Sequence, residues 1–433
     1  MNFKERLLKS EIIRSVLVLM TGTVLAQLIS YVAIMVISWI YSKEEVGDLG
    51  IYMRTVSFIA AVGTLRFEAS LPLGKHEGHS FLLYKLSLRI ATIILAACTF
   101  GGLLYFLVQP TGIQDVWFGL ITLASAFFVV FINLGTNWSI RNKEFKKISR
   151  QRIVNSFSGN GLRIVFGMIG MGSIGLLLGT LIGYAVSSSW YIRDFLRLDK
   201  SRYPKYSKKK QRVLVRENRE FPLVNLPHVT LDVGRDMIIA YFISYHFSQE
   251  IFGVYYHAMM ILAAPLSIIG VSIGQVLFNR FSELANSGKP TFLLVRKTLL
   301  ILLSISVVPF TSIFFFGEEL FTFIFTAKWA DSGFFSEIMA FWLMMLFVVS
   351  PLSSLPLVLR RQKEFFFISF IGSGIQLVGF GVLPFVIGNS SADWEQILWF
   401  VALAQIGYFT FVGLMYLYYA KKGVKGSCNQ LIQ

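Results

Sequence analysis

Five polar residues recur at helical spacing inside one hydrophobic stretch of the sequence. Asn225, His228, Asp232 and Arg235 follow at steps of three or four residues, and Asp236 stands four residues after Asp232. In a helix this spacing puts all five in one stripe. Carboxylate and imidazole groups in a low-dielectric cavity can bind a proton or a sodium ion, and Arg235 can neutralise one carboxylate. A self-neutralising cluster that packs helices is the alternative, but we favour a pathway.

Other ionisable residues also lie within hydrophobic stretches and support a second prediction. They are Arg54, Arg66, Glu68 and Arg163. Arg163 follows a small, polar run at 155–161 that would permit close helix approach or line a wet surface. Arg66 lies near the end of its stretch, where snorkelling to the interface explains it nearly as well.

The charged residues within these stretches number four arginines and three acids by our tally. Guanidinium groups stay charged and bind phosphate bidentately, so this balance favours an anionic passenger over a drug cation. Intramembrane charges are costly and usually mark a pathway. The tally covers Arg54, Arg66, Arg163, Arg235, Glu68, Asp232 and Asp236.

The elements that must position these residues are membrane-spanning helices. The chain has 55% hydrophobic residues, 15% charged residues and a mean hydropathy of +0.64. Long apolar runs near the length that crosses a bilayer recur throughout, and lipid leaves helices as the fitting structure. We therefore predict an all-α polytopic membrane protein with about twelve transmembrane helices. The predicted spans are 16–40, 48–73, 86–108, 115–138, 153–170, 173–192, 221–245, 251–277, 298–316, 334–358, 365–388 and 395–419.

The basic residues sort sharply between the two sides of this topology. Of the 40 lysines and arginines, 34 fall before the first span, after the last or in alternate loops on that side, and two fall on the other side. The positive-inside rule then predicts that both termini are cytoplasmic and that the span number is even. The same rule accounts for the net charge of +16 without a nucleic acid partner, and no nucleic-acid-binding module is present.

An internal repeat predicts two equivalent halves. The loop RNKEFKKIS (141–149) after the fourth span matches RQKEFFFIS (361–369) after the tenth at six of nine positions. Because six spans separate the copies, the halves have the same orientation, related by a parallel repeat with a cavity between them. We predict an N-terminal six-helix bundle (1–195), a basic cytoplasmic linker (196–220), a C-terminal six-helix bundle (221–420) and a cytoplasmic tail (421–433).

The basic linker has two explanations. Ordinary topology signalling accounts for its lysines and arginines, and this is the simpler reading. A basic juxtamembrane run also suits the anionic head groups of membrane lipids.

Catalytic motifs give no competing prediction. The five histidines have no metal-binding spacing and no phosphate-binding loop is present, so we predict no enzyme activity, no metal and no cofactor. A membrane glycan polymerase or ligase would need a large extracytoplasmic loop with polar catalytic residues. The longest such loop that we predict, 317–333, holds few charged groups, so this class is the least favoured.

Three segments resemble bacterial polysaccharide flippases, the O-antigen-type, lipid-linked oligosaccharide branch of the multidrug/oligosaccharidyl-lipid/polysaccharide exporter (MOP) superfamily. They are TLRFEASLPL (64–73), FPLVNLP (221–227) and APLSIIGVSIGQVLFNRFSEL (264–284). Span number, cytoplasmic termini and the six-plus-six organisation also match, so the resemblance covers nearly the whole chain. Twelve spans rather than fourteen make the related lipid II flippases a poorer match.

This resemblance implies a flippase in the bacterial cytoplasmic (inner) membrane. It would move an undecaprenyl-pyrophosphate-linked oligosaccharide by alternating access for O-antigen, capsule or exopolysaccharide synthesis, with a glycan polymerase and chain-length proteins as further partners. Arg54, Arg66 and Arg163 would contact pyrophosphate or acidic sugars. Glu68, Asp232 and Asp236 would serve as gates or couple transport to a H+ or Na+ gradient. An ion-coupled multidrug exporter of the same architecture is the alternative.

Overall fold

The computed structural model describes residues 11–74, 76–108, 112–197, 207–263, 266 and 270–423. Within these ranges the chain is helical and contains no strand, as predicted. The first ten residues, the linker segment 198–206 and the tail segment 424–433 lie outside the described residues, and so does part of the flippase-like segment 264–284. Contacts divide the chain into two compact units, 1–240 and 241–433, which we describe separately.

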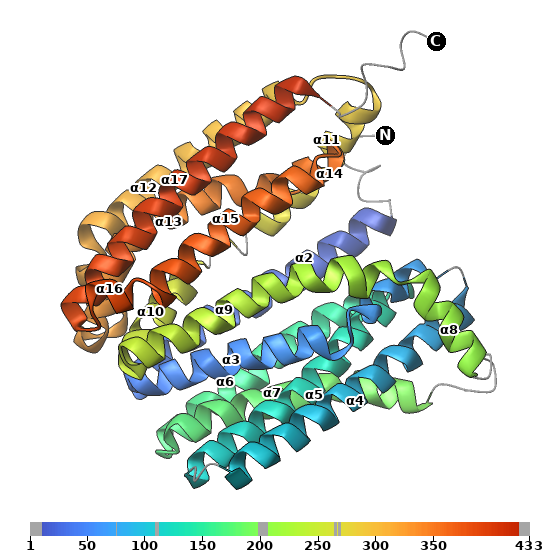
Figure 1. The fold of residues 1–433 in the computed structure, drawn as a ribbon, viewed down its shortest axis with the longest axis horizontal. Coiled ribbons are helices and arrows are strands. Elements are labelled where there is room, and N and C mark those ends of the chain that lie inside the picture. The colour runs from blue at the N-terminus through green and yellow to red at the C-terminus, as the bar shows by residue number, and fades with distance from the viewer. Residues whose placement is uncertain are drawn as a thin grey trace. The chain divides into compact units, whose positions relative to one another are not determined.

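The first unit is a bundle of long helices around α6 and α7 (Figure 1). α6 packs against α2 and α7, and α5 packs against α3, α4 and α7. Its elements are α2 (Glu11–Ile40), α3 (Lys43–Gly63), η1 (Phe67–Leu73), α4 (Glu77–Val108), α5 (Ile113–Arg141), α6 (Phe145–Met168), α7 (Gly172–Arg197), α8 (Lys208–Glu217), η3 (Phe221–Asn225) and α9 (Leu226–His246), whose last residues enter the second unit.

The second unit centres on α13, which packs against α10, α12 and α17. Its core is rich in aromatic residues, with Trp329, Trp342 and Trp394 fully buried. Its elements are α10 (Gln249–Leu262), α11 (Val271–Asn286), α12 (Phe292–Phe325), η5 (Ala327–Trp329), α13 (Ala330–Val349), η6 (Ser350–Leu352), α14 (Leu355–Val358), α15 (Gln362–Gly381), α16 (Pro384–Ile387) and α17 (Ser391–Lys422).

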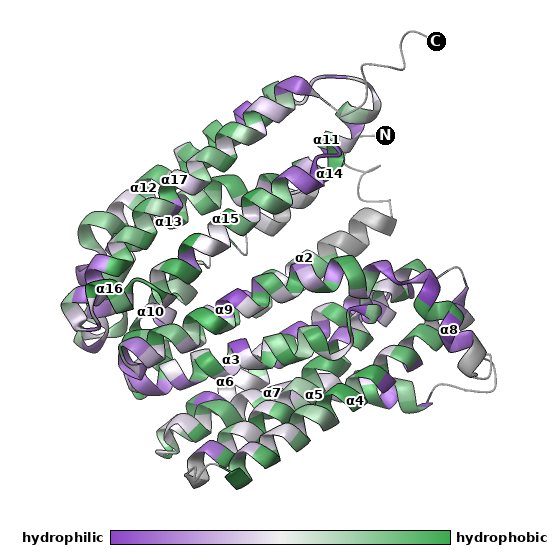
Figure 2. Cartoon of the chain, viewed as in Figure 1, coloured by the Kyte–Doolittle hydropathy of each residue, from purple (hydrophilic) through white to green (hydrophobic). Residues whose placement is uncertain are grey.

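Nine segments in the described part of the chain are long and apolar enough to cross a membrane. Figure 2 shows hydrophobic residues along much of their length and hydrophilic ones gathered near helix ends. The three remaining predicted spans correspond to α6, to α9 and to α10 followed by α11. α6 and α9 carry several polar and charged residues, and α10 and α11 are short, which explains why they fall outside the criteria of length and apolarity.

The second predicted span, 48–73, is not one helix. α3 ends at Gly63, and Leu65 and Arg66 then take left-handed conformations with φ of 49° and 63°. The chain continues in the 3-10 helix η1, which contains Pro72. Arg66 and Glu68 therefore lie beyond the end of the span helix, because residues with positive φ cannot continue a right-handed helix.

One predicted boundary in the second unit is also wrong, because the predicted loop 317–333 is almost entirely helical. The span 251–277 overlaps α10 and α11, and residues 264, 265 and 267–269 between them lie outside the described ranges. α12 bends at Phe316, whose φ of −135° departs from helical values, and it continues to Phe325 before a turn at Thr326. The predicted span ended before Glu318 and Glu319, but the helix continues through both charged residues.

The same turn occurs within the first copy of the repeat and directly before the second. Lys143 and Arg360 have φ of 59° and 56°, and in each case the following N–H donates to the carbonyl five residues earlier at 2.8 Å. The sequence alignment instead pairs Lys143 with Lys363, so the turn occurs three residues earlier relative to the second copy. The first compact unit extends to Ala240 and includes residues 221–240, which we assigned to the C-terminal bundle. The two six-helix bundles stay a prediction.

Candidate functional site

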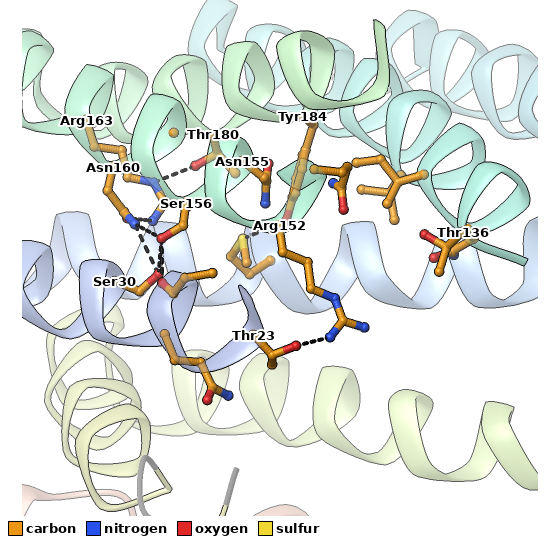
Figure 3. Close-up of a pocket in the computed structure, with 18 residues that line it drawn as sticks. Thr23, Ser30, Thr136, Arg152, Asn155, Ser156, Asn160, Arg163, Thr180 and Tyr184 are labelled. Atoms are coloured by element: carbon orange, nitrogen blue, oxygen red, sulfur yellow. Dashed lines mark hydrogen bonds between the residues drawn. The ribbon is translucent and has the colours of Figure 1, made fainter. Parts of the chain in front are cut away.

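A polar cavity of about 480 Å³ lies among the helices of the first unit (Figure 3). One face of α6 supplies its largest share of lining side chains, and α2, α3, α5 and α7 supply the others. The lining combines amides, hydroxyls and two arginines. The lining residues are Thr23, Ala26, Gln27, Ser30, Met53, Val129, Ile132, Asn133, Thr136, Gln151, Arg152, Asn155, Ser156, Gly159, Asn160, Arg163, Thr180 and Tyr184.

Glycines bring α6 and α7 into close contact beside this cavity. A Cβ atom built on Gly183 would lie 2.6 Å from the Cα atom of Gly159, and one built on Gly179 would lie 2.7 Å from the backbone nitrogen of Arg163. Small residues of this kind let helix backbones approach within a membrane protein. The predicted close approach of the 155–161 run is therefore present, and it places Arg163 beside α7.

Arg163 is held in the cavity by bonds to two helices. Its Nε donates to Thr180 Oγ1 of α7 at 2.8 Å, and its Nη1 donates to Asn160 Oδ1 of α6 at 2.9 Å. Tyr41 donates its hydroxyl to the backbone carbonyl of Arg163 at 2.6 Å. The guanidinium group is therefore oriented before any ligand arrives, which lowers the entropic cost of binding.

A hydrogen-bonded chain joins α6 to α2 on the same side of the cavity (Figure 3). Asn160 Nδ2 donates to Ser30 Oγ at 3.1 Å, and the hydroxyls of Ser30 and Ser156 lie 2.8 Å apart. Ser156 Oγ also donates to the carbonyl of Ala26 at 2.6 Å. These bonds satisfy buried polar groups that a cavity within a membrane bundle would otherwise leave unpaired.

Arg152 is the second cation of the cavity and lies about three helical turns before Arg163 on α6. Its Nη1 donates to Thr23 Oγ1 of α2 (Figure 3). In the ranges that the structure describes, neither arginine forms an ion pair, and no acidic residue lines the cavity. A guanidinium group has five N–H donors, so both arginines keep donors beyond those used by the protein.

This lining favours the binding of an anionic ligand that also carries hydroxyl groups. Two positive charges without a lining carboxylate attract phosphate or carboxylate groups. Amide and hydroxyl side chains can donate to and accept from the hydroxyls of a sugar.

The polar stripe on α9 forms ion pairs away from this cavity. Arg54 Nη1 of α3 lies 3.0 Å from Asp236 Oδ2, and Arg235 Nη2 donates to Asp236 Oδ1 at 2.8 Å. His228 Nδ1 lies 3.7 Å from Asp232 Oδ2. Both acids remain partly exposed, with 42% of the Asp236 side chain and 54% of the Asp232 side chain accessible. Arg235 thus neutralises Asp236, together with Arg54 from a neighbouring helix that the sequence did not pair with it.

Arg66, Glu68 and Asn225 form a third polar group in the first unit. Arg66 Nη1 lies 3.1 Å from Glu68 Oε1, and Arg66 Nε donates to Asn225 Oδ1 at 2.9 Å. Glu68 is almost fully buried and also accepts a hydrogen bond from Thr64. These contacts link η1 with η3, the π-helical turn that contains Pro222. Among the predicted pathway residues, only Arg163 lines the cavity, and the pathway role of the others stays a prediction.

Sequence reasoning missed two features of these sites. Arg152 was assigned to a loop, yet it stands three residues before Asn155 and continues the polar face of α6 by one turn, a signal that helical spacing contained. The tally of acids was wrong, because the predicted span 334–358 also holds Glu337. Further acids, Asp48, Asp115 and Glu395, stand at the edges of predicted spans. Arginines therefore outnumber acidic residues in the cavity but not in the predicted spans as a whole.

The fold and the cavity define a multi-pass helical membrane protein. Its fold is that of the MOP superfamily. The structure is similar to the lipid II flippase MurJ in an inward closed conformation, with a TM-score of 0.70 and 14% identity over 94% of this chain and 88% of that one. It is also similar to an inward-facing multidrug resistance MATE family transporter, with a TM-score of 0.61 and 14% identity over 92% and 96% of the chains.

The chain belongs to the polysaccharide biosynthesis protein family, whose model matches residues 86–333, more than half of its length. A third structure, MATE in complex with MaD3S, gives a TM-score of 0.60 at 15% identity over 94% and 96% of the chains. None of the curated proteins matches this sequence. MurJ gives the highest TM-score of these three, while the match covers a smaller share of MurJ than of the two MATE structures.

Proposed function

We propose that this protein is a flippase that moves an undecaprenyl-pyrophosphate-linked oligosaccharide across the bacterial cytoplasmic membrane by alternating access, for surface polysaccharide synthesis. The observation that carries the proposal is the cavity of the first unit, whose charged lining residues are Arg152 and Arg163. Membership of the polysaccharide biosynthesis protein family and the MOP fold support the same reading.

In this proposal the two arginines bind the negative charge of the passenger, on its pyrophosphate or on acidic sugars. Hydrogen bonds to Thr180 and Asn160 fix the orientation of the Arg163 guanidinium group, so its remaining N–H donors have a fixed direction. The amides and hydroxyls around it bind sugar hydroxyls without demanding one stereochemistry. Such a lining binds glycans of variable structure with moderate affinity. A transporter needs moderate affinity because it must also release its passenger.

The ion pairs of α3, α9 and η1 are the proposed gates. Asp232 and Asp236 are partly exposed and are held by His228, Arg54 and Arg235, so binding of H+ or Na+ would weaken these pairs and free the helices to move. The buried Glu68 would act in the same way on Arg66. Coupling to an ion gradient, cytoplasmic termini and cooperation with a glycan polymerase and chain-length proteins all belong to this proposal.

The deciding experiment replaces Arg163 with Gln in a strain whose surface glycan depends on this protein. Loss of one charge-assisted contact, worth about 1.5–3 kcal/mol, corresponds to about 10- to 150-fold weaker binding. We expect surface glycan to fall and the lipid-linked intermediate to accumulate, with Arg152→Gln acting in the same direction. Arg280→Gln removes an exposed arginine of the second unit and is the matched control.

The outcomes separate the candidate functions. Wild-type surface glycan in both cavity variants, at normal protein abundance, would refute the cavity as the passenger site. Loss of drug resistance with intact glycan would instead favour an ion-coupled multidrug exporter. Glycan bond formation by the purified protein would identify a polymerase or ligase.

A further inference from the structure

α8 is a short basic helix in the polar segment between α7 and α9. It begins after Ser207, whose Oγ accepts a hydrogen bond from the backbone N–H of Lys210 at 3.3 Å. Residues 207–219 contain a single acid, Glu217, and six basic residues. These are Lys208, Lys209, Lys210, Arg212, Arg216 and Arg219. Topology signalling alone explains the positive charge of this helix. Any further function must therefore be argued from the position of the helix and from the residues on each of its faces.

α8 is docked at one end of the first unit (Figure 1). Leu214 is 4% exposed and belongs to the same buried cluster as Phe81 and Tyr84 of α4. Glu217 Oε2 lies 3.8 Å from Nε2 of His79, which is also on α4. α4 is a candidate membrane span that starts at Glu77. These contacts hold α8 beside the first turns of a span, at the predicted cytoplasmic boundary of the membrane.

The face of α8 that points away from α4 is basic with apolar flanks. At about 100° per residue, Arg212 and Arg216 lie nearly opposite Leu214, and both are exposed. Val213 and Val215 lie between these faces and are 54% and 37% exposed. Figure 2 shows hydrophilic and hydrophobic residues together on this helix. Exposed valine side chains gain no stabilisation from contact with water. At a membrane interface they enter the acyl boundary, while arginine side chains reach the head groups.

We propose that α8 binds the head groups of anionic phospholipids at the predicted cytoplasmic surface of the membrane. Each guanidinium fork of Arg212 and Arg216 matches the geometry of a phosphate, and the exposed valines bring the helix to the depth of that phosphate. Glu217, the acid of the helix, faces His79 and not the basic side. This binding site is separate from the cavity of α6, and its test does not depend on the passenger.

The test is photolabelling of the full-length protein in a neutral detergent with photoactivatable phosphatidylglycerol, followed by mapping of labelled peptides. A phosphatidylcholine probe with the same acyl chains is the neutral comparison. Each cation near an anionic surface contributes about fivefold in affinity, so Arg212→Gln with Arg216→Gln should reduce labelling of 207–219 by about 30-fold. The matched control is Lys289→Gln with Lys421→Gln, which removes two exposed cations from the same predicted side of the second unit.

The proposal requires strong phosphatidylglycerol labelling of 207–219 that the control variant retains and the α8 variant loses. Thermal melting of both variants checks that the fold is intact, which we expect because Arg212 and Arg216 are exposed. Equal labelling by phosphatidylcholine, or labelling of 207–219 that survives in the α8 variant, would overturn it. In that case the basic residues of α8 would serve topology alone.

Discussion

Substitution of Gly183 by Ala tests how Arg163 is positioned. The new Cβ atom would lie 2.6 Å from Gly159 Cα and 2.9 Å from Gly159 N. Carbon atoms in contact need about 3.5 Å, so α6 and α7 would have to separate by about 1 Å at this point. The bond from Arg163 Nε to Thr180 Oγ1, now 2.8 Å, would lengthen to about 3.8 Å, beyond hydrogen-bonding range.

The expected cost follows from two terms. Overpacking costs about 1–3 kcal/mol, and the lost hydrogen bond to a charged group costs about 1.5–3 kcal/mol. The better helix propensity of alanine offsets about 0.5–1 kcal/mol. We therefore expect Gly183→Ala to lower the free energy of unfolding by about 1.5–5.5 kcal/mol, measured by denaturation in mixed micelles, and to impair surface glycan as Arg163→Gln does.

Two alanine variants on α6 control this result. A Cβ atom on Gly159 would lie 3.7 Å from Gly183 Cα, an ordinary contact, and one on Gly161 would meet no atom within 4 Å. Both variants should match or exceed the stability of the wild type, although Gly159 faces Gly183 directly. If Gly183→Ala is as stable as Gly161→Ala, the close approach of α6 and α7 does not hold Arg163, and the argument fails.

Two further substitutions test other contacts. Tyr41→Phe removes the hydroxyl that donates to the Arg163 carbonyl and should lower the free energy of unfolding by about 1 kcal/mol; an unchanged denaturation midpoint would contradict this role. Asp236→Asn removes the ion pair with Arg54 and should cost up to about 1 kcal/mol, because the carboxylate is partly exposed. Adding Arg54→Gln should recover part of that loss in a double-mutant cycle, and purely additive losses would show that the two residues do not interact.

The sequence predicted the helical membrane fold well because hydropathy and loop charge report it directly. The apolar runs that we predicted at 86–108 and 395–419 lie within α4 and α17. Helix ends were less predictable because local backbone choices decide them. Nothing in the composition of TLRFEASLPL requires positive φ at Leu65 and Arg66, so the end of α3 could not be seen.

The candidate site was only partly predictable for a similar reason. The sequence predicted that Arg163 follows the small, polar run 155–161 in one helix, and both belong to α6. The partners Thr180 and Thr23 come from other helices, and no spacing rule links them to α6. Tertiary packing alone brings these groups together.

The distribution of charge, more than its total, argues for an anionic passenger. On α3 and α9, Arg54 and Arg235 both contact Asp236. Asp232 lies beside His228, and Arg66 is paired with Glu68. Opposite charges this close cancel beyond a short distance and exert little attraction on a ligand. Among the described residues, no carboxylate lines the cavity beside Arg152 and Arg163, so their positive charge acts on a ligand that enters. We therefore expect these two side chains to select a passenger for negative charge, so that removing either weakens that selection while removing a paired arginine leaves it unchanged.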